Sequence, residues 1–326
     1  MSADDQPVTS REISQAVTVR QFFEAGKDRL ELVIMAGKGG LDRVIGEPSA
    51  YRPGLALTGF YEYFANQRVQ IIGRTEQAYL ESLSVAERSD RFKRLCEKQI
   101  PCLVFAKNKT IFPEILELGD RYGIPVLISN MPTRHFIQAA SYLLDNLAAP
   151  RCKLHGTMLE VSGLGVFIEG SAGVGKSETA LGLVRRGHAL VADDLVIFRR
   201  DYSGLLVGSA AEVTRHYMEI RGIGIIYMPA LFGIASVRGE KQLDLVVTLL
   251  PQSEAGDNID RSGEMDLRRE ILGVAIPQRI ILVAPGRDLI NIVEIAALEY
   301  KSRLSGQVAY QDLDERIKRH HVAIKE

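Results

Sequence analysis

The sequence predicts an α/β protein of two domains, a small N-terminal α/β domain and a C-terminal domain built around a phosphate-binding loop. The chain has 326 residues, and chains longer than about 250 residues usually divide into more than one domain. In the first part, short apolar runs alternate with polar segments of helical pattern. In the second part, the glycine-rich segment GSAGVGKS stands between a predicted strand and a predicted helix.

The N-terminal domain is predicted over residues 1–132. Its candidate strands are the apolar runs LELVIMAG, RVQIIG, PCLVFAKN and IPVLISN, and the long polar segment AYLESLSVAERSDRFKRLCEKQ has a helical pattern. The glycines of AGKGG are not followed by a complete nucleotide-binding fingerprint, so a plain turn is predicted there. The role of this domain is unassigned or regulatory.

The second domain is predicted over residues 133–326 and begins with a helix. In TRHFIQAASYLLDNLAA the apolar residues recur at helical spacing until Pro150 ends the segment. Two strand-like runs follow, LHGTMLEVS and VFIEG, and they are separated by a turn at Gly163 to Gly165. A hairpin is therefore expected to lead into the glycine-rich segment.

The glycine-rich segment matches the phosphate-binding pattern GxxxxGK[ST] at every fixed position. Its candidate nucleotide-binding residues are Gly170, Ser171, Ala172, Gly173, Val174, Gly175, Lys176 and Ser177. Glycines let backbone N–H groups converge on phosphate oxygens, and the N-terminus of the following helix adds partial positive charge. The lysine supplies a full charge for the terminal phosphates, and the serine hydroxyl is a candidate Mg²⁺ ligand.

Two aspartates end the strand-like run HALVADD, which follows the predicted P-loop helix. A parallel crossover brings them to the sheet edge that holds the phosphates. Because neighbouring strand residues point to opposite faces, Asp193 and Asp194 are expected to differ in role, one near Mg²⁺ and the other free to accept a proton. Further on, Glu219 and Arg221 share one face of a predicted strand. They are either a metal-binding carboxylate beside a phosphate-binding guanidinium, or part of an ordinary solvated face.

The composition argues against several classes of function. With 40 basic and 41 acidic residues, the chain has no excess charge that would attract nucleic acid. Cys96, Cys102 and Cys152 are too few and too irregularly spaced for a disulfide framework or a metal site, so buried thiols are predicted. The longest uncharged run, residues 222–237, is shorter than the ~20 residues that span a bilayer, and the N-terminus lacks a signal-peptide pattern. A cytoplasmic protein that binds neither nucleic acid nor membrane is expected.

Several motifs together resemble one family, the bifunctional HPr kinase/phosphorylases of bacteria. The motifs are HGTMLEV, GSAGVGKSETALGLVRRGHALVADD, EIRGIGI, DRSGEMD and LVAPGR, with a looser likeness in RPGLALTGF and GRTEQAYL. The resemblance covers most of the chain. It implies a serine/threonine protein kinase that regulates the phosphotransferase system by phosphorylating a serine of the phosphocarrier protein HPr, with ATP or pyrophosphate as donor and Mg²⁺ as cofactor. It also implies the reverse reaction, in which inorganic phosphate attacks phosphoserine and releases pyrophosphate.

The resemblance further implies a fold, an assembly and a set of site residues. The fold is a small α/β domain joined to a phosphoenolpyruvate-carboxykinase-like P-loop domain with a mixed sheet, and the assembly is a homohexamer. The implied metal ligands are Ser177 and Glu219, with Asp193 as a further candidate. The implied catalytic positions are His155, Lys176, Asp194 and Arg261, among which Asp194 is the general acid and base.

The alternative is a P-loop ATPase or a small-molecule kinase whose N-terminal domain binds a substrate or regulates the enzyme. A nucleotide-binding regulator without catalysis would keep Lys176 but would need no base such as Asp194. Incubation with HPr, ATP and Mg²⁺ separates these readings, because only the HPr kinase transfers label to HPr.

Overall fold

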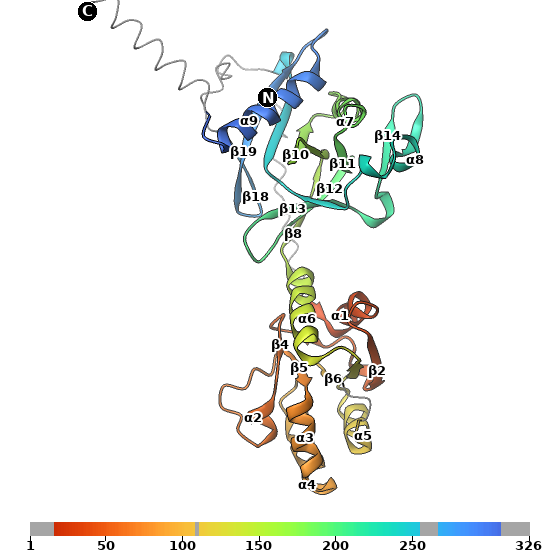
Figure 1. Ribbon diagram of the computed structural model, residues 1–326, viewed down its shortest axis with the longest axis vertical. Helices are drawn as coiled ribbons and strands as arrows, with labels where there is room; N and C mark the ends of the chain where they lie inside the picture. The colour runs from red at the N-terminus through yellow and green to blue at the C-terminus, as the bar shows by residue number, and fades with distance from the viewer. Residues whose placement is uncertain (1–15, 108–110, 255–266, 308–326) are drawn as a thin grey trace, which may run out of the picture. The chain divides into compact units, whose positions relative to one another are not determined.

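The computed structural model describes residues 16–107, 111–254 and 267–307. These residues form two compact units, 16–149 and 150–307 (Figure 1). The boundary thus lies after the helix α6 (Thr133–Ala148), whereas the sequence predicts it before that helix. The helix belongs to the first unit because its apolar residues, including Phe136 and Leu144, pack into that unit's core.

The first unit contains a five-stranded sheet in the order β2-β7-β6-β5-β4. Its strands are β2 (Leu32–Ala36), β4 (Ala50–Tyr51), β5 (Val69–Ile72), β6 (Leu103–Ala106) and β7 (Val126–Ser129). The strands β4 to β7 run parallel to one another, and β2 pairs antiparallel with β7 at one edge. A separate short pair joins β1 (Val17–Thr18) to β3 (Val44–Ile45).

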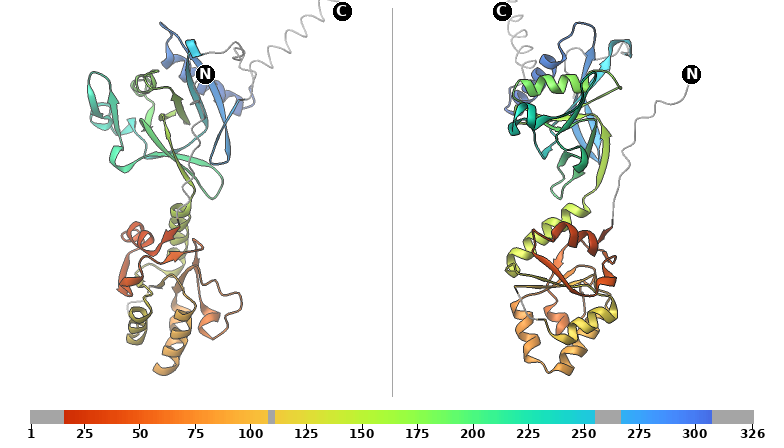
Figure 2. Two further views of the ribbon diagram at one scale, coloured as in Figure 1. Left: turned by 180° about the vertical axis from the view of Figure 1, so that it is seen from behind. Right: turned by 90° about the vertical axis from the view of Figure 1, so that its right-hand side faces the viewer.

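Helices cover both faces of this sheet (Figure 2). The helices on one face are α1 (Val19–Gly26) and α6, and those on the other are α2 (Gly54–Leu57), α3 (Arg74–Ser82), α4 (Val85–Glu97) and α5 (Pro113–Tyr122). In β6, Val104 faces the core under α6, while its neighbours Leu103 and Phe105 face the core under α3 to α5. A strand buried on both faces reads as a continuous apolar run, as the sequence of β6 does.

Two details of this unit refine the sequence interpretation. The long polar helical segment is divided at Ser84, whose side chain accepts the Glu87 N–H and so caps α4. The glycines of AGKGG form a plain turn, the short 3₁₀ helix η1 (Lys38–Gly40), preceded by Gly37 at φ 71°. A left-handed backbone of this kind favours glycine.

The second unit contains a six-stranded mixed sheet in the order β11-β9-β10-β17-β19-β18 and a four-stranded antiparallel sheet in the order β16-β13-β12-β8. The strands of the mixed sheet are β9 (Thr157–Val161), β10 (Leu164–Gly170), β11 (Ala189–Ala192), β17 (Leu245–Pro251), β18 (Arg268–Ile271) and β19 (Val274–Val283). Those of the antiparallel sheet are β8 (Arg151–His155), β12 (Leu195–Arg200), β13 (Leu206–Ala210) and β16 (Glu240–Gln242). A hairpin of β14 (Tyr217–Ile220) and β15 (Gly224–Tyr227) leads into α8 (Met228–Phe232).

The mixed sheet lies between two layers. The helices α7 (Lys176–Arg185) and α9 (Leu289–Leu304) share a core with one face, and the four-stranded sheet shares a core with the other. In β10, Ile168 faces the helices, whereas Phe167 faces the second sheet and meets Phe198 edge to face at a ring distance of 5.1 Å. This alternation follows from the period of two along a strand.

The predicted hairpin before the glycine-rich segment is present. It is formed by β9 and β10, which pair antiparallel. The strand β11, which follows α7, pairs antiparallel with β9 and therefore runs in the same direction as β10. The carboxyl ends of β10 and β11 thus reach the same sheet edge, as the sequence predicts, although β9 lies between them.

All three cysteines are buried, and none of them forms a disulfide. Burial raises the pKa of both Cys96 and Cys102 to about 12, so these thiols stay protonated at neutral pH. In the part of the chain that the structure describes, no helix is long and apolar enough to cross a membrane.

The P-loop helix α7 is tied to α9 by packing and by charge. A Cβ atom on Gly182 would lie 2.2 Å from Ile290 Cδ1, so the two helices are in close contact. On the same side, Arg186 Nη1 donates to Glu294 Oε2 at 2.6 Å, and His188 Nε2 lies 3.0 Å from Glu294 Oε1. The hydrogen bonds from Arg186 and His188 lower the pKa of Glu294.

Replacing Glu294 with glutamine is expected to destabilise the second unit by no more than about 1 kcal/mol near pH 7, because the pair is partly solvated. A carboxyl group whose pKa is lowered by folding contributes stability above its unfolded pKa, and this contribution is lost as the pH falls through the folded value. The difference in free energy of unfolding between Glu294→Gln and the unmutated chain should therefore become smaller as the pH falls below 4.5, the ordinary pKa of a glutamate carboxyl group. Urea midpoints measured across this pH range test the prediction, and a difference that stays constant with pH would contradict it.

Candidate active site

The glycine-rich segment forms a tight turn between a strand and a helix. It leaves β10 at Gly170 and enters α7 at Lys176. Gly173 and Gly175 have φ angles of 81° and 104°, a left-handed backbone that side chains with a Cβ rarely adopt. Gly175 is the N-cap of α7, so the free N–H groups of the helix begin inside the turn.

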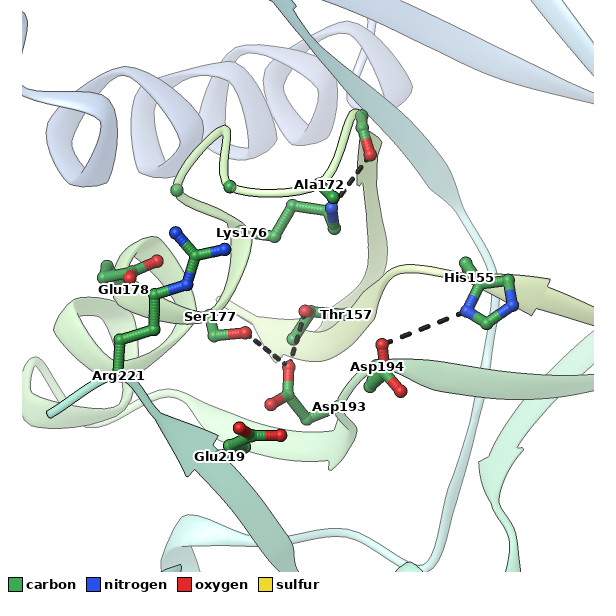
Figure 3. A pocket seen from close by; sticks show the side chains of 13 residues that line it. His155, Thr157, Ala172, Lys176, Ser177, Glu178, Asp193, Asp194, Glu219 and Arg221 are labelled. Atoms are coloured by element: carbon green, nitrogen blue, oxygen red, sulfur yellow. Dashed lines mark hydrogen bonds and ion pairs between the residues drawn. The ribbon is translucent and has the colours of Figure 1, made fainter. Parts of the chain in front are cut away.

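Lys176 reaches back across the loop. Its Nζ donates to the Gly170 carbonyl oxygen at 2.8 Å (Figure 3). It also donates to the Ser171 carbonyl oxygen at 2.9 Å. The ammonium group is thereby held on the concave side of the turn, where it can contact an anion bound by the backbone. Val174 points the other way and packs against the apolar core under α7 and α9.

Asp193 is half-buried and held by hydroxyl groups from two other elements. Its Oδ1 accepts from Thr157 Oγ1 at 2.7 Å and from Ser177 Oγ at 3.2 Å. Burial raises the pKa of Asp193, against the hydrogen bonds from Thr157, from Ser177 and from the backbone of Glu219, which favour the charged form. This carboxylate therefore lies directly beside the hydroxyl of the P-loop serine.

Asp194 has a different environment from its neighbour. Its side chain is 88% exposed, and its Oδ1 lies 3.9 Å from Nδ1 of His155, which is 80% exposed. The two residues meet because β12 and β8 pair with Leu195 opposite His155. Asp194 lies in the turn between β11 and β12, with a φ of 64°. The backbone holds this turn in place, since the Asp194 carbonyl accepts the Gly156 N–H at 3.0 Å.

These groups line one pocket of 330 Å³. The hairpin β14–β15 contributes Glu219 beside Asp193 and Arg221 beside the loop (Figure 3). A Cβ atom on Gly173 would lie 3.3 Å from the guanidinium nitrogens of Arg221, so that cation lies directly against the turn. The pocket is lined by His155, Thr157, Gly170, Ala172, Gly173, Gly175, Lys176, Ser177, Glu178, Asp193, Asp194, Glu219 and Arg221.

The structure thus brings together most of the residues singled out from the sequence. Arg261 lies outside the described residues. Arg221 lies in the turn that follows β14, not on the strand itself, and still reaches the pocket beside Glu219. Thr157 and Glu178 also line the pocket. The sequence pattern gave no signal for Thr157, because its contact with Asp193 joins distant segments, and Glu178 lies just beyond the fixed positions of the P-loop pattern.

The oxygen atoms around Ser177 suit a hard divalent cation. Serine hydroxyl and carboxylate oxygens are the ligands that Mg²⁺ prefers, and Mg²⁺ usually takes only one or two carboxylates from the protein and completes its shell with phosphates and water. Ser177 and Asp193 are already within hydrogen-bond distance, and Glu219 lines the same pocket. Within the described ranges, no group of three or more histidine, cysteine, aspartate or glutamate side chains could hold a metal by itself.

Comparison with known proteins covers both units. The family "HPr Serine kinase N terminus" matches residues 17–144, and the family "HPr Serine kinase C-terminal domain" matches residues 146–317. The chain is 44% identical over 278 residues to the HPr kinase/phosphorylase of Caldicellulosiruptor bescii, covering 85% of this chain and 89% of that protein. It is 39% identical over 291 residues to the HPr kinase/phosphorylase of Leptospira biflexa, covering 89% of this chain and 90% of that protein. A solved structure of the Hpr(Ser) kinase/phosphatase from Coxiella burnetii matches 51% of this chain and 97% of its own length, with 31% identity and a TM-score of 0.44.

Proposed function

The chain belongs to the HPr serine kinase family, and from this premise we propose that its P-loop pocket transfers a phosphoryl group between a nucleotide and a serine of HPr. Its activity is the phosphorylation of HPr and the removal of that phosphate. The P-loop and the exposed Asp194 carboxylate line one pocket at one edge of the mixed sheet, and this observation is the main support for the proposed site.

In the forward reaction, the phosphates of ATP or pyrophosphate bind the N–H groups of residues 170–177, with Lys176 on the terminal phosphates. The serine oxygen attacks the terminal phosphorus, and the bond from that phosphorus to the bridging oxygen breaks. Asp194 accepts the serine proton, because its solvent-facing carboxylate is open to an incoming protein chain. Phosphoryl transfer depends mainly on positioning and charge neutralisation, and the pocket supplies both.

Mg²⁺ is the proposed cofactor, held by Ser177, Glu219 and Asp193. When bound, it neutralises phosphate charge and orients the donor. Thr157 fixes the orientation of the Asp193 carboxylate through the 2.7 Å hydrogen bond, so it is a positioning residue for this site. Arg221 adds a positive charge against the P-loop turn, beside Gly173.

The reverse reaction uses the same groups. An oxygen of inorganic phosphate attacks the phosphorus of phosphoserine, pyrophosphate forms, and the bond to the serine oxygen breaks. Protonated Asp194 returns its proton to that leaving oxygen. His155 lies 3.9 Å from the same carboxylate and is proposed to hold it in position, and Arg261 is proposed to contact the transferred phosphate.

One assay tests the proposed function. The purified chain is incubated with HPr, labelled ATP and Mg²⁺, with HPr whose regulatory serine is replaced by alanine as the control. We expect label on the serine-containing HPr only. We then expect pyrophosphate release when phosphorylated HPr is mixed with inorganic phosphate. Phosphate release without labelled HPr would overturn the proposal in favour of an ATPase.

We also propose that the chain forms a homo-oligomer, a hexamer by family resemblance, in the cytoplasm. The helix α9 supports an assembly, because Val293 and Ala297 on one side are buried while Ile295 on the other is 63% exposed. The β14–β15 hairpin carries Ile223 in its turn and Ile225 on β15, at 74% and 75% exposure. These exposed apolar side chains are the candidate subunit contacts.

A further inference from the structure

The first unit has a cavity of its own, away from the P-loop. It measures 540 Å³ and opens at the carboxyl ends of the parallel strands β4, β5, β6 and β7, the sheet edge at which open α/β sheets bind ligands. Its volume lies within the range of about 300–1,000 Å³ that small-molecule sites occupy. The proposed kinase and phosphorylase reactions make no use of it.

Each of the four parallel strands delivers one basic side chain to this cavity. Arg52 directly follows β4, Arg74 begins the helix after β5, Lys107 directly follows β6, and Arg134 lies in the first turn of the helix after β7. These four residues are far apart in the sequence. Only the parallel order of the sheet gathers them at one opening.

The charges of this cluster are largely uncompensated. Arg52 is paired with the buried carboxylate of Glu76, Nη2 to Oε2 at 2.8 Å. Among residues 16–107, 111–254 and 267–307, no carboxylate forms an ion pair with Arg74, Lys107 or Arg134. Four cations and one carboxylate leave a local charge of +3, in a chain whose net charge is −1.

The first turns of two helices line the same cavity, and in one of them, α3, Glu76 already accepts the Gly73 N–H. The helix α6 begins after Pro132 with no side-chain cap among the described residues, so its first N–H groups are available to a ligand. Thr133 and Arg134 of this turn line the cavity, together with Arg74 and Thr75 from the start of α3. The two turns touch, because a Cβ atom on Gly73 would lie 2.9 Å from Thr133 Cγ2. The cavity therefore combines backbone donors, hydroxyl groups and cations.

We propose that this cavity binds a small molecule that carries at least two ionised phosphate groups. Arg74 and Arg134 present planar forks that match phosphate oxygens, and the N-terminus of α6 adds backbone donors that favour the same anions. A local charge of +3 suits a ligand with several negative charges, which a single carboxylate or chloride would not balance. A concave site of this volume fits a metabolite rather than a nucleic-acid strand.

Pyrophosphate binding to the full-length Lys176→Ala chain tests the proposal, because that background weakens binding at the P-loop. Calorimetry should find about one site per chain. Replacing Arg74 and Arg134 together with glutamine should weaken this binding at least about tenfold, since two charge-assisted contacts are lost. Both side chains are exposed, and far-ultraviolet circular dichroism verifies that the variant is folded. Hydrogen exchange should slow on binding at residues 73–76 and 133–136.

The matched control is Lys38→Gln with Arg121→Gln, which removes the same charge from the opposite edge of the same sheet. It should change the affinity less than twofold. Equal weakening by both double variants would mean general charge attraction and would overturn the proposal. Equal binding of citrate would overturn the phosphate preference, and binding of polyglutamate but not pyrophosphate would identify a protein-docking surface instead. Since the test uses the Lys176→Ala background and measures no catalysis, it is independent of the proposed reaction.

Discussion

Replacing Asp194 with asparagine is expected to slow phosphoryl transfer to HPr by about 10² to 10⁴-fold, the usual contribution of a general base. The change keeps the shape of the side chain and removes its ability to take the serine proton. Asp194 is 88% exposed, so the substitution leaves no buried group without a partner and the fold should be unchanged. Nucleotide affinity should stay within a few fold, because the P-loop and Lys176 are untouched.

The measurement is the single-turnover rate of label transfer from ATP to HPr, together with nucleotide affinity by calorimetry. Glu212→Gln serves as the matched control, since this exposed carboxylate lies in the same unit outside the pocket. The control should keep the full transfer rate. Normal transfer by Asp194→Asn would refute the assignment of the base, and a parallel loss of nucleotide affinity would give this carboxylate a binding role instead.

Replacing Lys176 with alanine is expected to weaken binding of ATP by about 10 to 100-fold. Hydrogen bonds to a charged group contribute about 1.5–3 kcal/mol, and each 1.4 kcal/mol corresponds to a factor of about ten in affinity. The lysine ammonium lies over the turn, 2.8 Å from the Gly170 carbonyl, so a phosphate bound there gains a full positive charge in contact. The backbone N–H groups remain, and residual binding should persist.

Calorimetric titration with ATP and Mg²⁺ measures this effect. Arg185→Ala is a suitable control because it removes a positive charge from the other end of the same helix. It should leave the affinity within about twofold. An unchanged affinity in Lys176→Ala would exclude the lysine from the phosphate site, while an equal loss in both variants would indicate damage to α7.

Features that depend on neighbouring residues could be predicted from the sequence. The turn from Gly170 to Lys176, the helix after it and the helix α6 follow from glycine spacing, apolar periodicity and Pro150. The sequence also predicts that Asp193 and Asp194 differ in environment, but the strand alternation that it assumes is not the cause. The strand β11 ends at Ala192, and the two aspartates lie in the turn before β12, where Asp194 has a φ of 64°.

Features that depend on pairing between distant segments could not be predicted. The hydrogen bond from Thr157 to Asp193 exists because β9 lies next to β11, and no local pattern encodes that neighbour. Arg221 reaches the P-loop from a turn because the β14–β15 hairpin folds toward it. The basic cavity of the first unit likewise needs the order of four strands, since its cations follow different strands.

We propose that two adjacent carboxylates have different roles. Asp193 binds the metal, and Asp194 is open to the incoming serine. The most direct test is the affinity of the ATP-bound enzyme for Mn²⁺, used in place of Mg²⁺ and followed by electron paramagnetic resonance. We predict that Asp193→Asn weakens Mn²⁺ binding at least about tenfold, whereas Asp194→Asn changes it by less than about threefold. Equal weakening in both variants, or a larger loss in Asp194→Asn, would contradict this difference in roles.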